Sequence, residues 1–510
     1  MSAWWTLLIV VVVALCALVV YDLVQRKHAI LRNFPVIGHF RFLLEAFGPE
    51  LRQYIVTGND EERPFSRDQR RWVYTSAKRG ETHFGFGSDT NLEAARGYVL
   101  LKHAAFPPPA PEGGDPPDTP LPCAKVLGAA HGRRHAFRPA SIVNVSGMSF
   151  GALSAPAVEA LNAGARLAGC MQNTGEGGLS EYHRQGGDLV FQVGTAYFGC
   201  RDPQGRFSLE RLVEVVDANP VRAIEVKLSQ GAKPGVGGFL PAAKVTAAIA
   251  AARGVPEGVD CASPPGHSEF RDVDGLIAFC ERIADATGRP VGIKSAVGHE
   301  GFWHELAARM AAHGAGPDFI TIDGGEGGTG SGPLVFTDHV SLPYALAQSR
   351  VYRAMAEHGM TDRVVFVGSG KLGFPESAML AFALGCDTVS VGREAMLSIG
   401  CIQAQRCHTG RCPSGVATQS PWLQRGLDPG LKSVRLANYV IALRRELVDL
   451  SRAMGFPHPA FVTLDDVELL DGPTRLRPAR EVFDYPPGHG RASAADLERL
   501  RHLMAGAGAA

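Results

Sequence analysis

From Ser141 to about Gln419 the chain alternates short apolar runs, rich in β-branched residues, with longer segments in which apolar positions recur every three to four residues. The first pattern is typical of buried parallel strands and the second of amphipathic helices. Eight short runs end in glycine-rich, polar loops, and they lie at 141–145, 170–173, 189–193, 223–228, 291–294, 319–322, 364–367 and 388–391. Eight strands that alternate with helices predict the α/β class and, within it, a (β/α)8 TIM barrel. A doubly wound sheet is the alternative, because it produces the same alternation.

The N-terminus has a different pattern. From Ala3 to Tyr21 the only polar residue is Thr6. A helix of this length spans about 28 Å at about 1.5 Å per residue, close to the thickness of the hydrocarbon core of a bilayer. We therefore predict a single transmembrane helix. A buried core helix and a secretory signal peptide are the alternatives, but the run lacks the basic start and the cleavage site of a signal peptide.

Basic residues follow this run directly, namely Arg26, Lys27, His28 and Arg32. The positive-inside rule then predicts a single-pass protein of the cell membrane whose catalytic domain is cytoplasmic. The patterns divide the chain into four parts: an anchor (1–25), an N-terminal collar with a Pro-rich linker (26–122), the barrel (123–420) and a C-terminal helical packing segment (421–510). The Pro-rich residues 107–122 cannot form regular helix or a central strand, so we expect a linker or an extended strap.

Composition narrows the function classes. Lys plus Arg equals Asp plus Glu at 51 each, so no global field favours nucleic acid as a partner. The 60 glycines cluster in loops between apolar segments, which suits backbone pressed against a ligand. Ten cysteines without a framework of spaced pairs indicate a reducing compartment.

Three cysteines, Cys401, Cys407 and Cys412, stand close together in the run CIQAQRCHTGRCPSG. Thiolates at this spacing, with a proline after the last one, are typical of iron–sulfur ligation. Structural zinc is the alternative, although the run lacks the C-x2-C signature and would need His408 as the fourth ligand. We expect an electron-carrying cluster here, whereas isolated cysteines such as Cys123 fit the role of small buried hydrophobes.

Charged residues follow several of the predicted strands. Glu176 lies in the loop NTGEGG, at the carboxyl end of a strand, where barrels place their sites. Lys227 and Lys233 in EVKLSQGAKPGVGG, with Arg253 on a later helical segment, could pair with the two carboxylates of a small dianionic substrate. Scattered surface lysines are the alternative. Lys294 ends another strand and needs an anion if it is buried, for which a flavin ring that gains negative charge on reduction is a candidate.

Glycine-rich loops indicate where a phosphate could bind. The loops 323–332 and 367–373 both follow strands, and their N–H groups could hold one phosphate. Gly325, Gly327 and Gly330 also fit G-x-G-x-x-G, but no helix follows immediately, which disfavours a dinucleotide. A single phosphate favours FMN over NAD or FAD. The loop SGMSFGALS (146–154), whose small residues would let a flat ring lie against the backbone, precedes a helix expected from about Ala155.

Five motifs, SGMSFGALS, NTGEGG, EVKLSQGAKPGVGG, GGEGGTGSG and CIQAQRCHTGRCPSGVATQ, occur in an order that resembles the FMN-binding synthase domain of glutamate synthases over about 141–419. The resemblance implies a barrel that holds FMN, a 2-oxoglutarate site, and a 3Fe–4S cluster on Cys401, Cys407 and Cys412. The implied catalytic residues are Glu176, Lys227, Lys233 and Arg253. The implied flavin contacts are Ser149, Thr174, Gln192, Lys294, Gly327, Gly328, Gly368, Gly370, Gly392 and Arg393.

The chain also departs from the large enzymes of that family. An apolar anchor precedes the barrel instead of a glutamine-hydrolysing domain, and the long C-terminal β-helical domain is missing. We therefore expect the nitrogen to come from ammonia or from glutamine hydrolysed by a partner. The electrons would come from a ferredoxin or a separate NAD(P)H-oxidising subunit. Phe239 replaces a glutamine that the family usually carries near the substrate. The leading hypothesis is reductive amination of 2-oxoglutarate to L-glutamate; the alternatives are an FMN and iron–sulfur oxidoreductase acting on another oxo or amino acid, and a membrane-tethered redox relay.

Overall fold

The computed structural model describes residues 3–25, 29–58, 61–83, 85–88, 90–91, 96–109, 120–472 and 474–507. It contains two compact units, Met1–Asp68 and Gln69–Ala510, which we describe separately. The basic residues Arg26, Lys27 and His28 and most of the Pro-rich stretch (110–119) lie outside the described residues. The predictions made on them, and the division into four parts, stay predictions.

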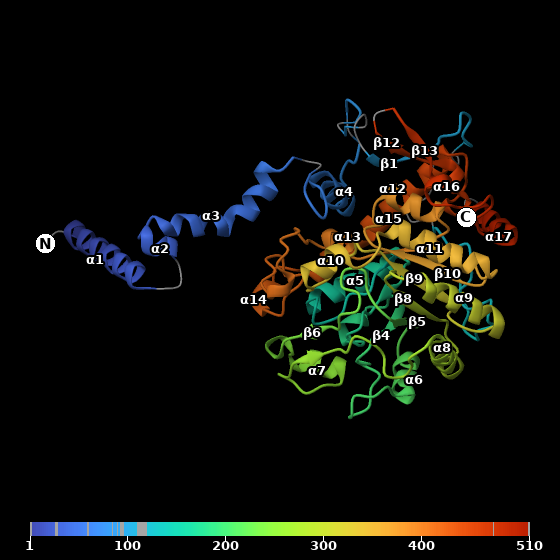
Figure 1. The fold of residues 1–510 in the computed structure, drawn as a ribbon, viewed down its shortest axis with the longest axis horizontal. Helices are drawn as coiled ribbons and strands as arrows, with labels where there is room; N and C mark the ends of the chain where they lie inside the picture. The colour runs from blue at the N-terminus through green and yellow to red at the C-terminus, as the bar shows by residue number, and fades with distance from the viewer. Residues whose placement is uncertain are drawn as a thin grey trace. The chain divides into compact units, whose positions relative to one another are not determined.

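Eight parallel strands in the second unit close into a barrel in the order β10-β11-β2-β3-β4-β5-β8-β9. Figure 1 labels five of these strands, β4, β5, β8, β9 and β10. The strands are β2 (Val143–Val145), β3 (Gln172–Asn173), β4 (Leu189–Val193), β5 (Val221–Lys227), β8 (Val291–Ser295), β9 (Phe319–Asp323), β10 (Val365–Ser369) and β11 (Thr388–Val391). Each overlaps one of the eight predicted runs. The (β/α)8 TIM barrel is therefore confirmed, and the doubly wound alternative is wrong because the sheet closes on itself.

Helices alternate with these strands and cover the barrel. They are α5 (Ala155–Ala168), α6 (Leu209–Asp217), α7 (Ala247–Arg253), α8 (Val273–Thr287), α9 (Gly301–His313), α10 (Leu334–His339), α11 (Tyr344–Glu357), α12 (Pro375–Ala383) and α13 (Arg393–Ser398). The first, α5, begins where the sequence predicts: the Ser154 hydroxyl caps it by accepting the N–H of Ala157, and Gly169 ends it with a left-handed φ of 63°.

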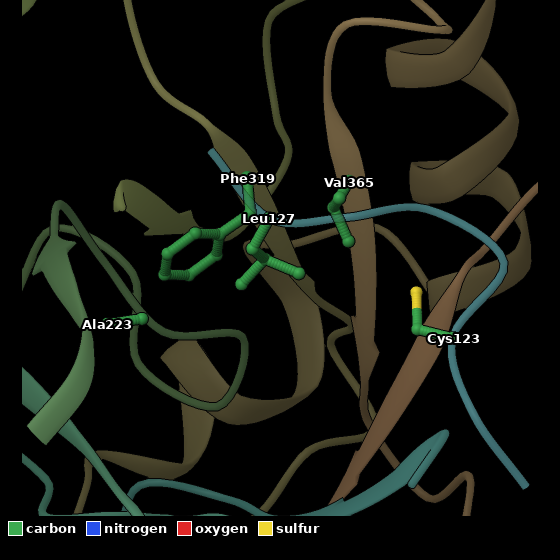
Figure 2. Close-up of a cluster of buried hydrophobic side chains, with 5 residues drawn as sticks. All are labelled: Cys123, Leu127, Ala223, Phe319 and Val365. Atoms are coloured by element: carbon green, nitrogen blue, oxygen red, sulfur yellow. The ribbon is translucent and has the colours of Figure 1, made fainter. Parts of the chain in front are cut away.

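The end of the barrel at which the strands begin is filled by apolar side chains (Figure 2). Cys123 and Leu127, from the segment before β2, pack with Ala223, Phe319 and Val365 near the starts of β5, β9 and β10, and all five are buried. Cys123 is thus a small buried hydrophobe, as predicted, and burial raises the pKa of its thiol far above the ordinary value. In barrels of this type the active site lies at the opposite end, where the strands end.

Further elements surround the barrel. The expected long C-terminal helix is α15 (Pro429–Ala453), which packs against α5, α12 and α13. The pattern did not predict a three-stranded antiparallel sheet, in which β12 (Val467–Asp471) pairs with both β1 (Arg96–Leu101) and β13 (Leu476–Pro478). It also missed the two-stranded antiparallel sheet formed by β6 (Phe239–Leu240) and β7 (Cys261–Ala262). The remaining helices of this region are α4 (Arg67–Ala77), α14 (Pro421–Gln424), α16 (Ala479–Val482) and α17 (Ala494–Ala507).

The first unit contains α1 (Ala3–Val24), α2 (Ala29–Asn33), α3 (Gly38–Leu51) and a π-helical turn, η1 (Arg52–Val56). Of the helices in the described part of the chain, α1 alone is long and apolar enough to cross a membrane, with a mean hydropathy of 3.0. Its 22 residues span about 33 Å at about 1.5 Å per residue. The helix is confirmed. An N-terminal signal sequence would meet the same criteria, so its insertion into a membrane stays a prediction.

Candidate active site

The predicted site residues lie at the carboxyl ends of the barrel strands. Thr174 follows β3, Gln192 lies near the end of β4, Lys227 is the last residue of β5, and Lys294 lies near the end of β8. These four polar side chains are all buried. Since the carboxyl ends of parallel strands open on the same face of a barrel, the polar groups share one site.

A carboxylate and three cations meet at this face. The Nζ of Lys227 lies 2.8 Å from Oε1 of Glu176 and also donates to Oε1 of Gln230 at 2.6 Å. Burial alone would raise the pKa of Glu176, but Lys227, Lys233 and Arg253 more than offset it, so the pKa lies below the ordinary value. Burial lowers the pKa of Lys233, and Glu176 opposes that shift. The structure thus brings together the predicted acid and the predicted cations, and the alternative of scattered surface lysines is wrong.

Arg253 reaches this group from outside the barrel strands. It is the last residue of α7 and is buried, its Nη2 donates to the carbonyl of Phe150 at 3.3 Å, and its guanidinium lies 4.9 Å from the ring centroid of Phe198. Its Nε has no hydrogen-bond partner among the described residues. The loop of Glu176 packs tightly against α7, because a Cβ on Gly178 would lie 2.2 Å from the carbonyl oxygen of Ala252. That contact brings Arg253 near Glu176.

A buried carboxylate that sequence reasoning missed organises the centre of the barrel. Glu225 on β5 accepts hydrogen bonds from Asn173 Nδ2 at 2.8 Å, from Gln192 Nε2 at 2.7 Å and from Thr321 Oγ1 at 2.6 Å. These bonds join β3, β4, β5 and β9 and fix the orientation of the Gln192 amide. The available signal was an ionisable residue between Ile224 and Val226, two positions before Lys227 and therefore on the same side of the strand.

Lys294 has a carboxylate partner within the protein. Its Nζ lies 3.3 Å from Oδ2 of Asp323, which also accepts the N–H of Gly231 at 3.0 Å. Burial disfavours the ammonium, but Asp323 and Glu225 raise the pKa of Lys294 above its ordinary value. Burial likewise opposes ionisation of Asp323, yet Lys294 and the Gly231 N–H hold its pKa below the ordinary value. Asp323 therefore accounts for the buried lysine, and the expected flavin contact of Lys294 stays a prediction.

Glycines let the first two loops of the barrel touch. Gly175 has a left-handed φ of 67°, and a Cβ there would lie 2.5 Å from the backbone nitrogen of Ser149. A Cβ on Gly147 would lie 2.8 Å from Asn173 Oδ1 and 2.9 Å from Gln192 Nε2. The predicted flavin residue Ser149 is thus beside the loop of Thr174, which suits a flat ring lying against backbone.

The predicted phosphate loops also lie side by side, because β9, β10 and β11 are neighbours in the barrel. Arg393, the first residue of α13, donates to the carbonyl of Glu326, and burial lowers its pKa. A Cβ on Gly328 would lie 2.6 Å from Arg393 Cδ, and one on Gly370 would lie 3.1 Å from the nitrogen of Gly324. The other predicted glycines of these loops are Gly327, Gly368 and Gly392. A side chain at Gly328 would collide with Arg393, and one at Gly370 would crowd the backbone of Gly324; the phosphate contact of these residues stays a prediction.

The cysteine loop carries three free thiols, on Cys401, Cys407 and Cys412. Burial raises the pKa of Cys401 to about 12, and the other two cysteines add to the shift, so the thiols lie near enough to interact. Gln403 and Gln405 adopt left-handed φ angles of 58° and 53°, which coil the backbone between the first two cysteines.

Within the described ranges, no three His, Cys, Asp or Glu side chains converge on a common metal-ion position. Three free thiols on one coiled loop are the side chains that the predicted 3Fe–4S cluster would use, and structural zinc stays the alternative. The cluster itself stays a prediction.

Comparison with known proteins places these features in a family. Residues 127–457 match the conserved region in glutamate synthase. The glutamate synthase large subunit-like protein YerD of Bacillus subtilis is 38% identical over 480 residues, which cover 87% of this chain and 90% of that protein. The archaeal glutamate synthase (NADPH) of Methanocaldococcus jannaschii is 36% identical over 316 residues, 61% of this chain and 59% of that protein.

Among solved structures, a mandelate oxidase variant with an FMN adduct is 15% identical, with a TM-score of 0.40 over 82% of this chain and 96% of that one. A TM-score this low carries no argument about the site. The family match and the relative from Bacillus subtilis, each covering most of the chain, decide the assignment. The chain belongs to the glutamate synthase family of oxidoreductases.

Proposed function

We propose that the protein reductively aminates 2-oxoglutarate to L-glutamate with bound FMN and a 3Fe–4S cluster, using ammonia and electrons supplied from outside the chain. The observation that carries the proposal is the group formed by Glu176, Lys227, Lys233 and Arg253. Three cations and one carboxylate leave about two positive charges in a largely buried space, which complements a substrate with two carboxylates. Membership of the family supports the reaction class.

The residues divide the work by their charge. Lys227 and Lys233 would bind the carboxylates of the substrate, and the unpaired Nε–H of Arg253 is a further donor. Glu176, which stays ionised at neutral pH, would take up a proton as ammonia adds to the keto carbon and pass it to the carbonyl oxygen, which leaves as water. Gln230, bonded to Lys227 at 2.6 Å, would hold that lysine in place when the substrate displaces Glu176.

Other residues of the barrel would hold the two cofactors. Ser149, Thr174, Gln192 and Lys294 would contact a flavin ring, and the loops around Gly328, Gly370 and Arg393 its phosphate. Cys401, Cys407 and Cys412 would bind the cluster. When bound, FMN supplies hydride transfer and the cluster supplies single electrons. The protein's part is to exclude water and to fix the substrate beside the ring.

We also propose that α1 spans the cell membrane and holds the barrel in the cytoplasm, with no role for nucleic acid. The electron donor would be a ferredoxin or an NAD(P)H-oxidising subunit. Basic groups surround the cysteine loop: Arg406 and Arg411 are exposed, and Lys244 Nζ lies 3.4 Å from the carbonyl of His408. This surface favours a donor protein with an acidic face.

A second function is favoured by Phe239. Its ring is 61% exposed on β6, and the adjoining Gly238 lies beside the pocket, since a Cβ on it would be 3.5 Å from Oε1 of Glu176. An apolar ring in that place favours an oxo or amino acid with one carboxylate and an apolar side chain. The third candidate function, a membrane-tethered redox relay, requires no substrate pocket.

One experiment separates the three. Full-length protein is purified anaerobically in detergent and reduced chemically, and 2-oxoglutarate is then added with ammonium. We expect the flavin to be reoxidised as L-glutamate forms, and we expect both effects to be lost in Lys227→Ala and Lys233→Ala but kept in the surface control Lys102→Ala. Reoxidation without glutamate contradicts the proposal. Reoxidation by an apolar oxo acid supports the second function, and normal redox titration with no effect of either lysine variant supports the relay.

A further inference from the structure

Helix α3 presents an apolar face to solvent. Phe40, Leu43, Leu44, Phe47 and Leu51 are each between 43% and 61% exposed. Large apolar side chains scattered singly on a surface are ordinary, but five on one helix of 14 residues are not. The described residues of the first unit leave this face uncovered.

The spacing of these residues places them on one side of the helix. Steps of three, one, three and four positions keep all five within one stripe along α3. The opposite side of the helix is mixed: Arg41 donates from Nε to Oε1 of Glu45 at 2.8 Å, and Phe42 shares that side. An apolar stripe opposite a side that carries a charged pair is compatible with a helix that lies in the plane of a membrane interface.

A turn that is fixed by hydrogen bonds links α3 to the apolar helix α1. The carboxylate of Asp22, in the last turn of α1, is buried and accepts the N–H of Val36 at 2.8 Å. It also lies 2.9 Å from Nε2 of His39, in the first turn of α3. Helix α3 approaches α2 closely, because a Cβ on Gly38 would lie 3.0 Å from Leu31 Cδ2. These contacts hold the start of α3 next to the end of α1.

We propose that α3 is an interfacial helix whose apolar face is covered by the lipid bilayer. The inference rests on the proposed membrane insertion of α1. If α1 spans the bilayer, Asp22 lies at its edge, and the turn pinned by Asp22 leaves α3 beginning at that boundary. Helix α3 then has lipid beside it at its first residue. The protein would then be anchored by two helices: α1, which crosses the bilayer, and α3, which lies along its surface.

The test uses the full-length protein in vesicles of phosphatidylcholine and phosphatidylglycerol. A fluorescent non-natural amino acid is placed singly at Phe47 on the apolar face, at Glu45 on the opposite side, or at Val12 in the middle of α1. Quenching is measured with lipids that carry a nitroxide either near the headgroup or deep in the acyl chain. We expect at least twofold stronger quenching at Phe47 by the shallow label than by the deep one, the reverse order at Val12, and little quenching at Glu45.

The outcomes separate the two proposals. If Val12 is not quenched by the deep label, α1 does not span the bilayer and both proposals fall. If Val12 is quenched but Phe47 is not, only the interfacial helix is overturned. Energy transfer between differently labelled copies at Phe47 would then identify a second copy as the occupant, and its absence would identify another protein surface.

A variant gives an independent measurement. With the label at Leu51, the double substitution Leu43→Glu and Phe47→Glu is expected to abolish shallow quenching, because two carboxylates oppose insertion of the stripe. The label at Val12 in the same variant is expected to keep its deep quenching, which shows that the protein is folded into the membrane. Unchanged quenching at Leu51 in this variant would also overturn the proposal.

Discussion

Replacing Lys227 by methionine removes one charge from the proposed substrate pocket and keeps the length of the side chain. The lysine is buried, and its Nζ lies 2.8 Å from the carboxylate of Glu176. Removing one partner of a buried ion pair costs about 3–5 kcal/mol. The side chain of Glu176 is 22% exposed and keeps Lys233 and Arg253 nearby, so we expect a smaller loss than this range, about 2 kcal/mol.

This loss can be expressed as a change in melting temperature. Unfolding entropy is about 2.1 cal/mol/K per residue, so a unit of about 440 residues gains about 0.9 kcal/mol/K. A loss of about 2 kcal/mol then lowers Tm by about 2 °C. The matched control is Lys102→Met, whose ion pair with Glu468 is 3.1 Å long and more exposed. Such a pair contributes about 1 kcal/mol or less, so its Tm is expected to fall by no more than about 1 °C.

The pH dependence gives a second, independent readout. In the parent protein the lowered pKa of Glu176 adds stability above the pKa of the unfolded chain, and this is lost as pH falls through the folded pKa. Without Lys227, burial raises the pKa of Glu176, so the variant takes up its proton at higher pH. The difference in Tm between the two proteins should be largest near neutral pH and shrink in acid. Scanning calorimetry at several pH values tests this, and equal losses for both lysine variants, or a difference independent of pH, would refute the reasoning.

Three further predictions concern the same face of the barrel and its surroundings. Gly175→Ala should abolish flavin retention, because the new Cβ would lie 2.5 Å from a backbone nitrogen. The control Gly359→Ala should retain the flavin, because Gly359 has nearly the same φ, 66°, but open space around it. Flavin absorbance per polypeptide measures retention in both variants. Burial lowers the pKa of His183 to about 4, so the stability of the protein should fall as pH drops below about 6.5. Tm followed from pH 8 to 5 should depend less on pH in His183→Gln than in the parent protein. Asp323→Asn should leave Lys294 without its nearest carboxylate and lower the unfolding free energy by about 3 kcal/mol, measured by denaturant titration; a change under about 1 kcal/mol would contradict the ion-pair account.

The sequence pattern was sufficient to predict the barrel, because its strands are buried on both faces. β9, for example, is buried along its whole length, and a short apolar run that ends in a glycine loop indicates a buried parallel strand; the count of eight such runs favoured the barrel over the doubly wound sheet. The position of Glu176 and Lys227 at strand ends could also be predicted from the sequence, since the barrel topology alone brings such ends together.

The hydrogen-bond and ion-pair partners of the buried polar residues could not be predicted from the sequence. That Glu225 would bind Asn173, Gln192 and Thr321 depends on which strands are neighbours in the closed barrel, and a linear pattern does not contain that order. For the same reason, Asp323 could be placed in a loop but not beside Lys294. The pairing of β1 with β12 joins residues more than 350 positions apart, beyond the reach of local periodicity.

The most direct test of the central claim is spectroscopic, on full-length protein purified without oxygen. We predict the absorption bands of a flavin near one FMN per chain and, in the oxidised protein, the EPR signal of a 3Fe–4S cluster. We expect that signal to disappear in Cys407→Ala and to persist in Cys16→Ala, whose thiol is exposed on α1. Protein that stays colourless and free of iron after reconstitution would contradict the account.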